Sequence, residues 1–379
     1  MKFAVSISFF VFGLFGAFAQ ISNVQEKFPL PASLSESSGI IYFNGKLITH
    51  NDSGENDNKL YEVDLGDESV TRTVTISGAT NIDWEDITQD DTSIYIGDIG
   101  NNISGNRDDL KIYKISKSDY LSMNTVIAET ISFSYSDQTD FTATSANNTE
   151  WDAEALVSYD ASNLILFTKN WVNGITKGYL VSKTPGTYSL TPLTTTLNSN
   201  GLITGGTYNP FTAKLFLVGY NNTLQPFVWE CENFTGSNVF SGTNTQTQLS
   251  SLVQEQVEAI TFVDENSYLI TSESFLITLG PFTASGDAKL ISFSTNDVAL
   301  SMDDEYKTHD LSLFPNPVED VLHIKGSEIA SVQVYDTKQV KLYDGNNFLI
   351  DTSPLSSGIY FVNVRFNNHT SVIKKIIKK

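Results

Sequence analysis

A short motif recurs five times in this chain of 379 residues. Each copy opens on a Glu or on a Gly pair and runs into an apolar segment. The repeated Glu or Gly stands at 36, 85, 154, 205 and 258, so the steps are 49, 69, 51 and 53 residues. A period near fifty residues is typical of propeller blades and solenoids, not of α/β units. The five copies are Glu36–Ile40, Trp84–Ile87, Ala153–Leu156, Thr204–Thr207 and Val257–Ile260.

The first repeat shows what each unit contains. Two apolar runs flank Asn44-Gly45, a dipeptide that favours a tight antiparallel hairpin. A polar loop follows, and then two further segments alternate between apolar and polar residues, as half-buried strands do. Four antiparallel strands in about fifty residues make one propeller blade. The expected strands of this blade are 39–43, 46–50, 59–65 and 69–76.

The other copies fit the same plan, so the sequence predicts an all-β, five-bladed β-propeller. The 69-residue step leaves six blades open, but 137–150 is better interpreted as an inserted loop than as a hidden blade. The fifth copy lacks an obvious fourth strand. We expect Val24–Leu30, at the start of the mature chain, to supply this strand and close the ring.

The ends of the chain predict an exported protein. Residues 1–19 carry Lys2, an apolar run and Ala17-Phe18-Ala19, the pattern of a cleaved signal peptide. No later stretch is apolar enough over about 20 residues to span a bilayer. The expected organisation is signal peptide 1–19, propeller 20–296, linker 297–310, and a small Ig-like β-sandwich over 311–379.

The last module resembles the C-terminal sorting domain of the type IX secretion system. The matching residues are Leu313–Pro317 (Leu-Phe-Pro-Asn-Pro), Val318–Leu322, Gly358–Val362 and the basic end Lys374–Lys379. The resemblance implies that the type IX secretion machinery recognises this tail. It also implies that the protein is released or held at the outer cell surface.

Charge and cysteine content narrow the class of function. The formal net charge is −21, yet 311–379 holds eight Lys and Arg against six Asp and Glu, so the acidity belongs to the propeller. Such a domain repels nucleic acid and attracts cations. The one cysteine, Cys231, lies in an alternating segment without a neighbouring His or Lys and is expected to be a buried hydrophobe rather than a reactive thiol.

The five repeat openings also resemble those of the SdiA-regulated propeller family, which open on Ser-Gly, Glu-Gly or Glu-Ala pairs. This resemblance covers about 260 residues, and it implies a fold and calcium as a ligand more than a defined activity.

The repeat places acidic residues on one face of the propeller. In a four-stranded meander, the start of the first strand and the loop between strands two and three lie at the same edge. Like charges about 4 Å apart repel by roughly 4 kcal/mol at an effective dielectric near 20, so a cation or a shared proton must relieve them. Ca²⁺ accepts such hard oxygen ligands, whereas zinc would need more than His50, which is the propeller's only histidine before the linker. The predicted metal ligands are Glu36, Glu85, Glu154 and Glu258.

Alternatively, each of these glutamates caps a neighbouring blade or pairs with Arg107 or Lys169, and no metal is bound. The loops on the same face supply the predicted ligand-binding residues Asp52, Asp98, Asn101, Arg107, Asn170, Trp171 and Glu273. Catalysis has weak support. His50 and Asp98 are the candidate bases, although a lone His at a strand end is more often a surface residue.

Together these features predict a secreted or cell-surface propeller that binds an extracellular ligand, with calcium, in an acidic funnel. Two alternatives stay open. One is a metal-dependent hydrolase of a phosphoester, lactone or glycan, and the other is a structural or adhesive surface protein.

The module boundary yields a prediction. Deleting 311–379 should leave the propeller folded but retain it in the periplasm, because the tail has its own strands and charge balance. Cell fractionation and the melting temperature of the truncated protein check this, and loss of folding would contradict the boundary.

Overall fold

A computed structural model describes residues 21–52, 57–279, 282–297, 311–326, 329–336, 341–366 and 371–379. The predicted signal peptide lies outside these residues, as does nearly all of the predicted linker. The chain divides into two compact units, residues 1–299 and 300–379. Within the described ranges, no helix has both the length and the apolar character needed to traverse a bilayer.

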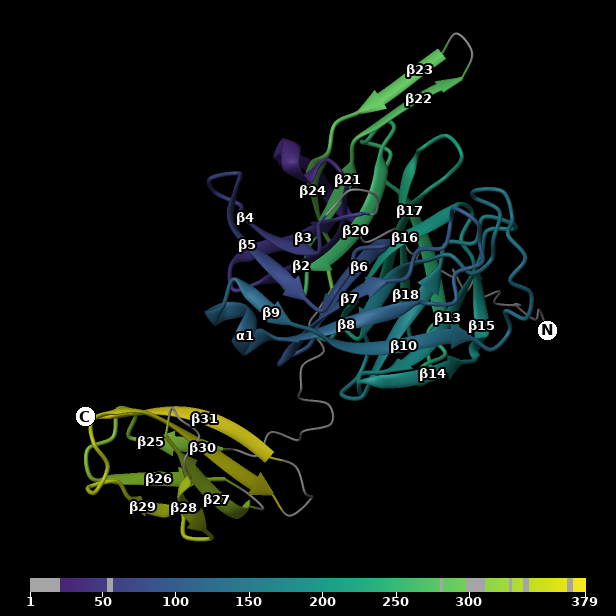
Figure 1. The fold of residues 1–379 in the computed structure, drawn as a ribbon. Coiled ribbons are helices and arrows are strands. Elements are labelled where there is room, and N and C mark those ends of the chain that lie inside the picture. Colours follow the sequence, from purple (N-terminus) through teal and green to yellow (C-terminus); the bar gives the residue numbers. More distant parts are fainter. Residues whose placement is uncertain are drawn as a thin grey trace, which may run out of the picture. The chain divides into compact units, whose positions relative to one another are not determined.

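The first unit is built from antiparallel sheets that each begin with one of the five repeats (Figure 1). Among the described residues there are five such sheets, so the predicted five-bladed propeller is confirmed.

Blade 1 contains β2 (Ser37–Phe43), β3 (Lys46–Asn51), β4 (Lys59–Asp64) and β5 (Ser69–Ser77). Blade 2 contains β6 (Trp84–Gln89), β7 (Ser93–Asp98), β8 (Lys111–Ser116) and β10 (Glu129–Tyr135). Blade 3 contains β11 (Ala153–Ser158), β12 (Asn163–Thr168), β13 (Ile175–Ser182) and β15 (Pro192–Asn198). Blade 4 contains β16 (Leu202–Asn209), β17 (Lys214–Tyr220), β18 (Pro226–Glu232) and β19 (Thr243–Gln248).

Blade 5 is closed by a strand from the N-terminal end of the described residues, as predicted. Its own strands are β20 (Gln256–Phe262), β21 (Ser267–Glu273) and β24 (Lys289–Ser294). The fourth strand, β1 (Ser22–Pro29), pairs antiparallel with β24, and Leu30 continues the ladder by donating to the Ala288 carbonyl. The pairing removes an exposed edge from the last blade.

The innermost strands form a closed ring, in which β2 contacts β6 and β20, β11 contacts β6 and β16, and β16 contacts β20. These strands are buried along almost their whole length, whereas the outer β5 alternates between exposed and buried residues. A separate apolar cluster fills the space between each pair of neighbouring blades. Cys231 is buried in the cluster between blades 3 and 4, which confirms the hydrophobic role predicted for it.

Two blades gain a fifth strand that the repeat did not predict. The chain leaves β8 through helix α1 (Lys117–Ser122) and pairs β9 (Thr125–Ile127) in parallel with β5 of blade 1. From blade 3, β14 (Gly186–Leu190) pairs in parallel with β10 of blade 2. The detour through α1 and β9 accounts for part of the 69-residue step between Glu85 and Glu154. The segment 137–150 contains no strand, as the inserted-loop interpretation predicted.

A two-stranded hairpin extends from blade 5 between β21 and β24 (Figure 1). It consists of β22 (Phe275–Leu279) and β23 (Phe282–Gly286), and a short 3₁₀ helix, η1 (Ala32–Leu34), follows β1. Phe275 is buried at the base of the hairpin, whereas Leu276 is exposed.

The second unit consists of two antiparallel sheets that share one apolar core, as expected for a small sandwich. Val332, Val362 and Val364 are completely buried in this core. The three-stranded sheet contains β25 (Ser312–Phe314), β26 (Val321–Lys325) and β29 (Leu349–Asp351). The four-stranded sheet contains β28 (Lys341–Gly345), β27 (Ile329–Tyr335), β30 (Gly358–Phe366) and β31 (Ser371–Lys378).

The closure of blade 5 yields a second prediction. Removing 20–32 should expose β24 as an unpaired edge, lower the melting temperature of the propeller by several degrees and promote aggregation. Thermal melting with light scattering measures both effects. A truncated protein that melts at the wild-type temperature would show that β1 contributes nothing to ring closure.

Candidate metal centre and ligand cleft

A β-bulge occurs at the same place in the innermost strand of every blade. The register with the second strand shifts between Ser37 and Gly39, Trp84 and Asp86, Ala153 and Ala155, Ile203 and Gly205, and Val257 and Ala259. A bulge leaves one residue outside the ladder and redirects its side chain. The five residues left out are Ser38, Glu85, Glu154, Thr204 and Glu258.

These bulges correct the alignment of the repeats. The sequence pattern aligned Glu36 and Gly205 with Glu85, Glu154 and Glu258, but the equivalent residues are Ser38 and Thr204. Ser38 Oγ donates to the Glu85 carbonyl of the next blade at 2.7 Å, and Thr204 Oγ1 donates to the Val257 carbonyl at 2.6 Å. Two blades therefore use a hydroxyl group where the other three carry a carboxylate. Glu36 lies before the bulge and is exposed.

The carboxylates near the bulges of blades 2 and 3 lie close enough to share a cation. One ligand oxygen from each of Asp52, Asp83 and Glu85 lies within 4.8 Å of the others, and the same holds for Glu85, Asp152 and Glu154. Glu85 belongs to both groups and is only 3% exposed. Its Oε1 is buried without a hydrogen-bond partner among the described residues. We name these five residues the acidic cluster.

Gly100 allows two members of the acidic cluster to approach each other. A Cβ at this position would overlap Glu85 Oε1 and Asp83 Oδ2. Any other residue would force the two carboxylates apart, so the absence of a side chain at Gly100 preserves the Asp83–Glu85 pair.

Lys169 neutralises the glutamates on the other side of the propeller mouth, which is the end of the ring of innermost strands where the bulges lie. This lysine follows β12, and its Nζ lies 2.7 Å from Glu154 Oε2 and 4.0 Å from Glu258 Oε2. Nζ also lies 5.0 Å from the centre of the Trp171 ring and 5.6 Å from that of Tyr220. Glu154 therefore fits the alternative prediction, in which a repeat glutamate pairs with Lys169. Glu85 does not fit it, since no described ion pair involves Glu85.

Backbone and side-chain donors hold the remaining acids in place. Asp152 accepts the Asn101 backbone N–H at 2.6 Å and the Trp171 indole N–H at 2.6 Å. Arg107 donates to Asp98 Oδ1 at 2.9 Å and to the Gly100 carbonyl at 2.8 Å. Arg107 and Asp98 thus brace the loop that carries Gly100.

Burial shifts the titration of these carboxyl groups upward. Burial, followed by the neighbouring Glu154, raises the pKa of Glu85 well above its ordinary value. Burial is also the main reason that the pKa of Glu258 rises to about 7 and that of Glu273 to about 9. Although burial alone would lower the pKa of Lys169, the Glu154 and Glu258 carboxylates raise it above its ordinary value. The mouth therefore has an excess of acids that one lysine does not balance.

The two candidate bases, His50 and Asp98, are both buried and have packing or pairing partners. His50 is completely buried, its ring packs edge-on against Trp84 at 5.6 Å, and burial lowers its pKa to about 4. The expectation that a histidine at this strand end lies at the surface was wrong. Asp98 is also completely buried and is paired with Arg107.

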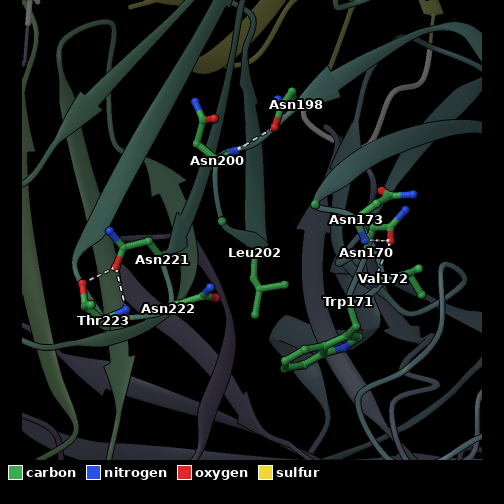
Figure 2. Close-up of a pocket in the computed structure, with 12 residues that line it drawn as sticks. Asn170, Trp171, Val172, Asn173, Asn198, Asn200, Leu202, Asn221, Asn222 and Thr223 are labelled. Carbon is green, nitrogen blue, oxygen red and sulfur yellow. Dashed lines mark hydrogen bonds between the residues drawn. The ribbon is translucent and has the colours of Figure 1, made fainter.

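A cleft of about 590 Å³ lies beside the acidic cluster, between blades 3 and 4 (Figure 2). Three connections line it: the β12–β13 loop, the β15–β16 connection and the β17–β18 loop. Trp171 joins the cleft to the cluster through its bond with Asp152. The lining residues are Asn170, Trp171, Val172, Asn173, Gly174, Asn198, Asn200, Gly201, Leu202, Asn221, Asn222 and Thr223.

The structure thus separates the predicted ligand-binding residues into groups. Asn170 and Trp171 line the cleft, and Asp52 lies in the acidic cluster. Asp98, Asn101 and Arg107 form the bracing network, and Glu273 accepts a hydrogen bond from Gln256. The sequence interpretation missed Asn198 and Asn200 as cleft residues. The only available signal was the density of asparagine in these loops.

A second hollow, of about 710 Å³, lies at the opposite ends of the innermost strands. Its lining includes the aromatic residues Tyr159, Tyr208 and Phe211 and the cations Lys117 and Lys183. No acidic cluster of metal-binding geometry lies there among the described residues.

The raised pKa values predict how stability depends on pH in the absence of metal. Glu258 and Glu273 titrate near 4.5 when unfolded but near 7 and 9 when folded, so the folded state binds more protons between those values. The free energy of unfolding in EDTA should therefore fall as the pH rises from 6.5 to 9. Each carboxyl group contributes a decrease of about 1.4 kcal/mol per pH unit below its folded pKa, so Glu258 contributes up to about pH 7 and Glu273 up to about pH 9. His50 has the opposite sign but acts only between about pH 4 and 6.5.

Urea unfolding at pH 6.5, 7.5 and 9 measures this dependence. Glu273→Gln should flatten the curve, and the exposed Glu129→Gln should leave it unchanged. Stability that rises with pH over this range would contradict the buried, protonated state of these acids.

Comparison with known proteins identifies the second unit. Residues 312–379 match the family described as the secretion system C-terminal sorting domain. No curated protein matches the chain. Among solved structures, PorZ is described as an essential surface component of the type IX secretion system of Porphyromonas gingivalis. It is 13% identical with a TM-score of 0.32, over 90% of this chain and 45% of PorZ, so this chain spans about half the length of PorZ.

Two further solved structures are similar. The calcium-binding protein regucalcin from Agrobacterium tumefaciens is 10% identical with a TM-score of 0.36, over 74% of this chain and 94% of that protein. A Bombyx mori β-fructofuranosidase is 8% identical with a TM-score of 0.42, over 94% of this chain and 89% of that enzyme. The sorting-domain match has the clearest consequence: the protein is exported by the type IX secretion system to the cell surface or the extracellular space.

Proposed function

We propose that this protein is a cell-surface or secreted binding protein whose propeller holds a calcium ion in the acidic cluster and binds a ligand beside it. The observation that carries the proposal is the buried, unpartnered Glu85 Oε1 in a group of carboxylates. A buried charge without a partner costs several kcal/mol, and a cation removes that cost.

Asp52, Asp83 and Glu85 are the preferred ligands. The other group is less accessible to an ion, because Glu85, Asp152 and Glu154 are all buried. Asp52 is partly exposed, so an ion can reach the first group from solvent. Ca²⁺ fits an oxygen-only set of this kind, with backbone oxygens and water completing six to eight ligands. The resemblance to the SdiA-regulated propeller family supports the same choice of metal.

This proposal differs from the predicted ligand set of Glu36, Glu85, Glu154 and Glu258. Only Glu85 remains a preferred ligand, while Glu154 and Glu258 share Lys169. Glu36 lies before the bulge and is exposed. The bulges explain the difference, because they set which residue of each repeat is redirected.

The geometry favours binding over hydrolysis. A metal-dependent hydrolase would need a base that reaches a metal-bound water. His50 is completely buried against Trp84, and Asp98 is committed to Arg107. A purely structural or adhesive role would leave the cleft beside the ion without a ligand.

Melting the mature chain in calcium and in EDTA tests the metal proposal. At 100 times its dissociation constant, calcium should add about 2.7 kcal/mol to the free energy of unfolding, or several degrees to the melting temperature. Glu85→Gln should abolish this gain and, in EDTA, should melt at or above the wild-type temperature, because a neutral amide costs less to bury than a carboxyl group whose ionised form has no partner. Glu154→Gln and Glu258→Gln should weaken the gain less.

Glu129→Gln is the matched control, since Glu129 is exposed on β10, and it should keep the full calcium response. A wild-type melting temperature that does not respond to calcium would refute the metal centre.

A further inference from the structure

The cleft between blades 3 and 4 is uncharged, although it lies beside the acidic cluster. Of its lining residues, six are asparagines and none is an Asp, Glu, Lys or Arg. The chain as a whole carries 44 acidic residues, so an uncharged hollow at the acidic mouth stands out. Side-chain amides donate and accept hydrogen bonds at the same time, which suits ligands that present both groups.

Internal hydrogen bonds hold the three connections that form the cleft. Asn170 Oδ1 accepts the backbone N–H groups of Val172 and Asn173 at 3.1 and 3.2 Å. Asn221 Oδ1 accepts the N–H of Thr223 at 2.9 Å. The loops are therefore shaped before any ligand arrives, and less entropy is lost on binding.

Several amide groups remain for a ligand. The Nδ2 group of Asn221 donates to no described residue, and neither amide atom of Asn222 forms a hydrogen bond within the described part of the chain. Figure 2 shows the Asn222 side chain pointing toward Leu202, on the side of the cleft opposite Trp171. Asn222 is exposed, so its amide can exchange water for a ligand hydroxyl at little cost.

Trp171 supplies an aromatic surface with a fixed position. Its indole N–H is bonded to Asp152 Oδ2, and Lys169 Nζ lies 5.0 Å from its ring centre. In Figure 2 the ring extends beneath Leu202. An aromatic ring whose edge is anchored can stack against an apolar ligand face without losing further freedom.

We propose that this cleft binds a neutral, hydroxyl-rich carbohydrate. This assignment rests on the proposed role as a binding protein and names the class of its ligand. The asparagine amides pair with sugar hydroxyls, and Trp171 stacks against the C–H face of a sugar ring. The lining contains no Lys or Arg that could pair with an anionic ligand, which disfavours uronates, sulfated glycans and nucleotides. A volume of about 590 Å³ is in the usual range for a small-ligand site.

A glycan array tests the assignment on the full mature chain in calcium. The array carries neutral glucan, mannan, galactan and N-acetylglucosamine oligomers beside uronate and sulfated glycans. Neutral oligomers should be retained and anionic ones should not. Calorimetry with the best neutral oligomer should then show that Asn222→Ala weakens binding about three- to tenfold, the value of one hydrogen bond.

Trp171→Ala should weaken the same binding more than tenfold. Asn148→Ala is the matched control, because Asn148 is an exposed asparagine outside the cleft, and it should bind like the wild type. Asn222→Ala should not change the melting temperature, since its amide bonds no described residue.

The assignment is overturned if no neutral oligomer binds, if anionic glycans bind better, or if Asn222→Ala binds as well as Asn148→Ala. Calcium-dependent melting of the same sample separates this failure from that of the proposed function. A chain that calcium stabilises but that binds no neutral glycan refutes only the ligand class. A chain that shows neither response refutes both.

Discussion

The bulge in each innermost strand is the constraint on which the rest of the propeller mouth depends. It takes one residue per blade out of the hydrogen-bond ladder, at the same position five times. Without it, the pleat of the strand would direct these side chains alternately toward the neighbouring blades. With it, Glu85, Glu154 and Glu258 face one another around a ring that backbone pairing keeps closed. The hydrogen-bonded sheets therefore hold these like charges close together, and no flexible loop has to do so.

The distribution of charge around this ring is uneven. Lys169 satisfies Glu154 and lies near Glu258, so that side is balanced within the protein. Glu85, Asp83 and Asp52 form the other side, where Gly100 lets two carboxylates approach and Glu85 Oε1 has no described partner. Trp171 connects the acidic cluster to the cleft, because its indole N–H is bonded to Asp152 and its ring lies beside Lys169. A change of charge in the cluster would therefore reach the cleft through a single side chain.

Much of the fold followed from periodicity, and the errors have identifiable physical reasons. The repeat predicted five blades and the closure by Val24–Leu30, because turns and alternation are local signals. The added strands β9 and β14 were missed, since strands of three and five residues that pair with another repeat leave almost no local pattern. Glu36 was aligned with Glu85 by charge, whereas the ladder aligns Ser38, and a bulge cannot be recognised before the pairing is known. Asn222 and Asn198 belong to different blades, so only the closed ring brings them into one cleft.

The exchanged strands β9 and β14 have a consequence for how this propeller can change. Each runs at the outer edge of one blade but is encoded in the next, so blades 1, 2 and 3 interlock. Loss or duplication of any one of these repeats would leave the outermost strand of a neighbouring blade without its pairing partner. Blade 4 lacks such an overlap with its neighbours in the described sheets. From this pairing we expect whole-blade insertion or deletion to be tolerated best beside blade 4, and the first three blades to change only as one block.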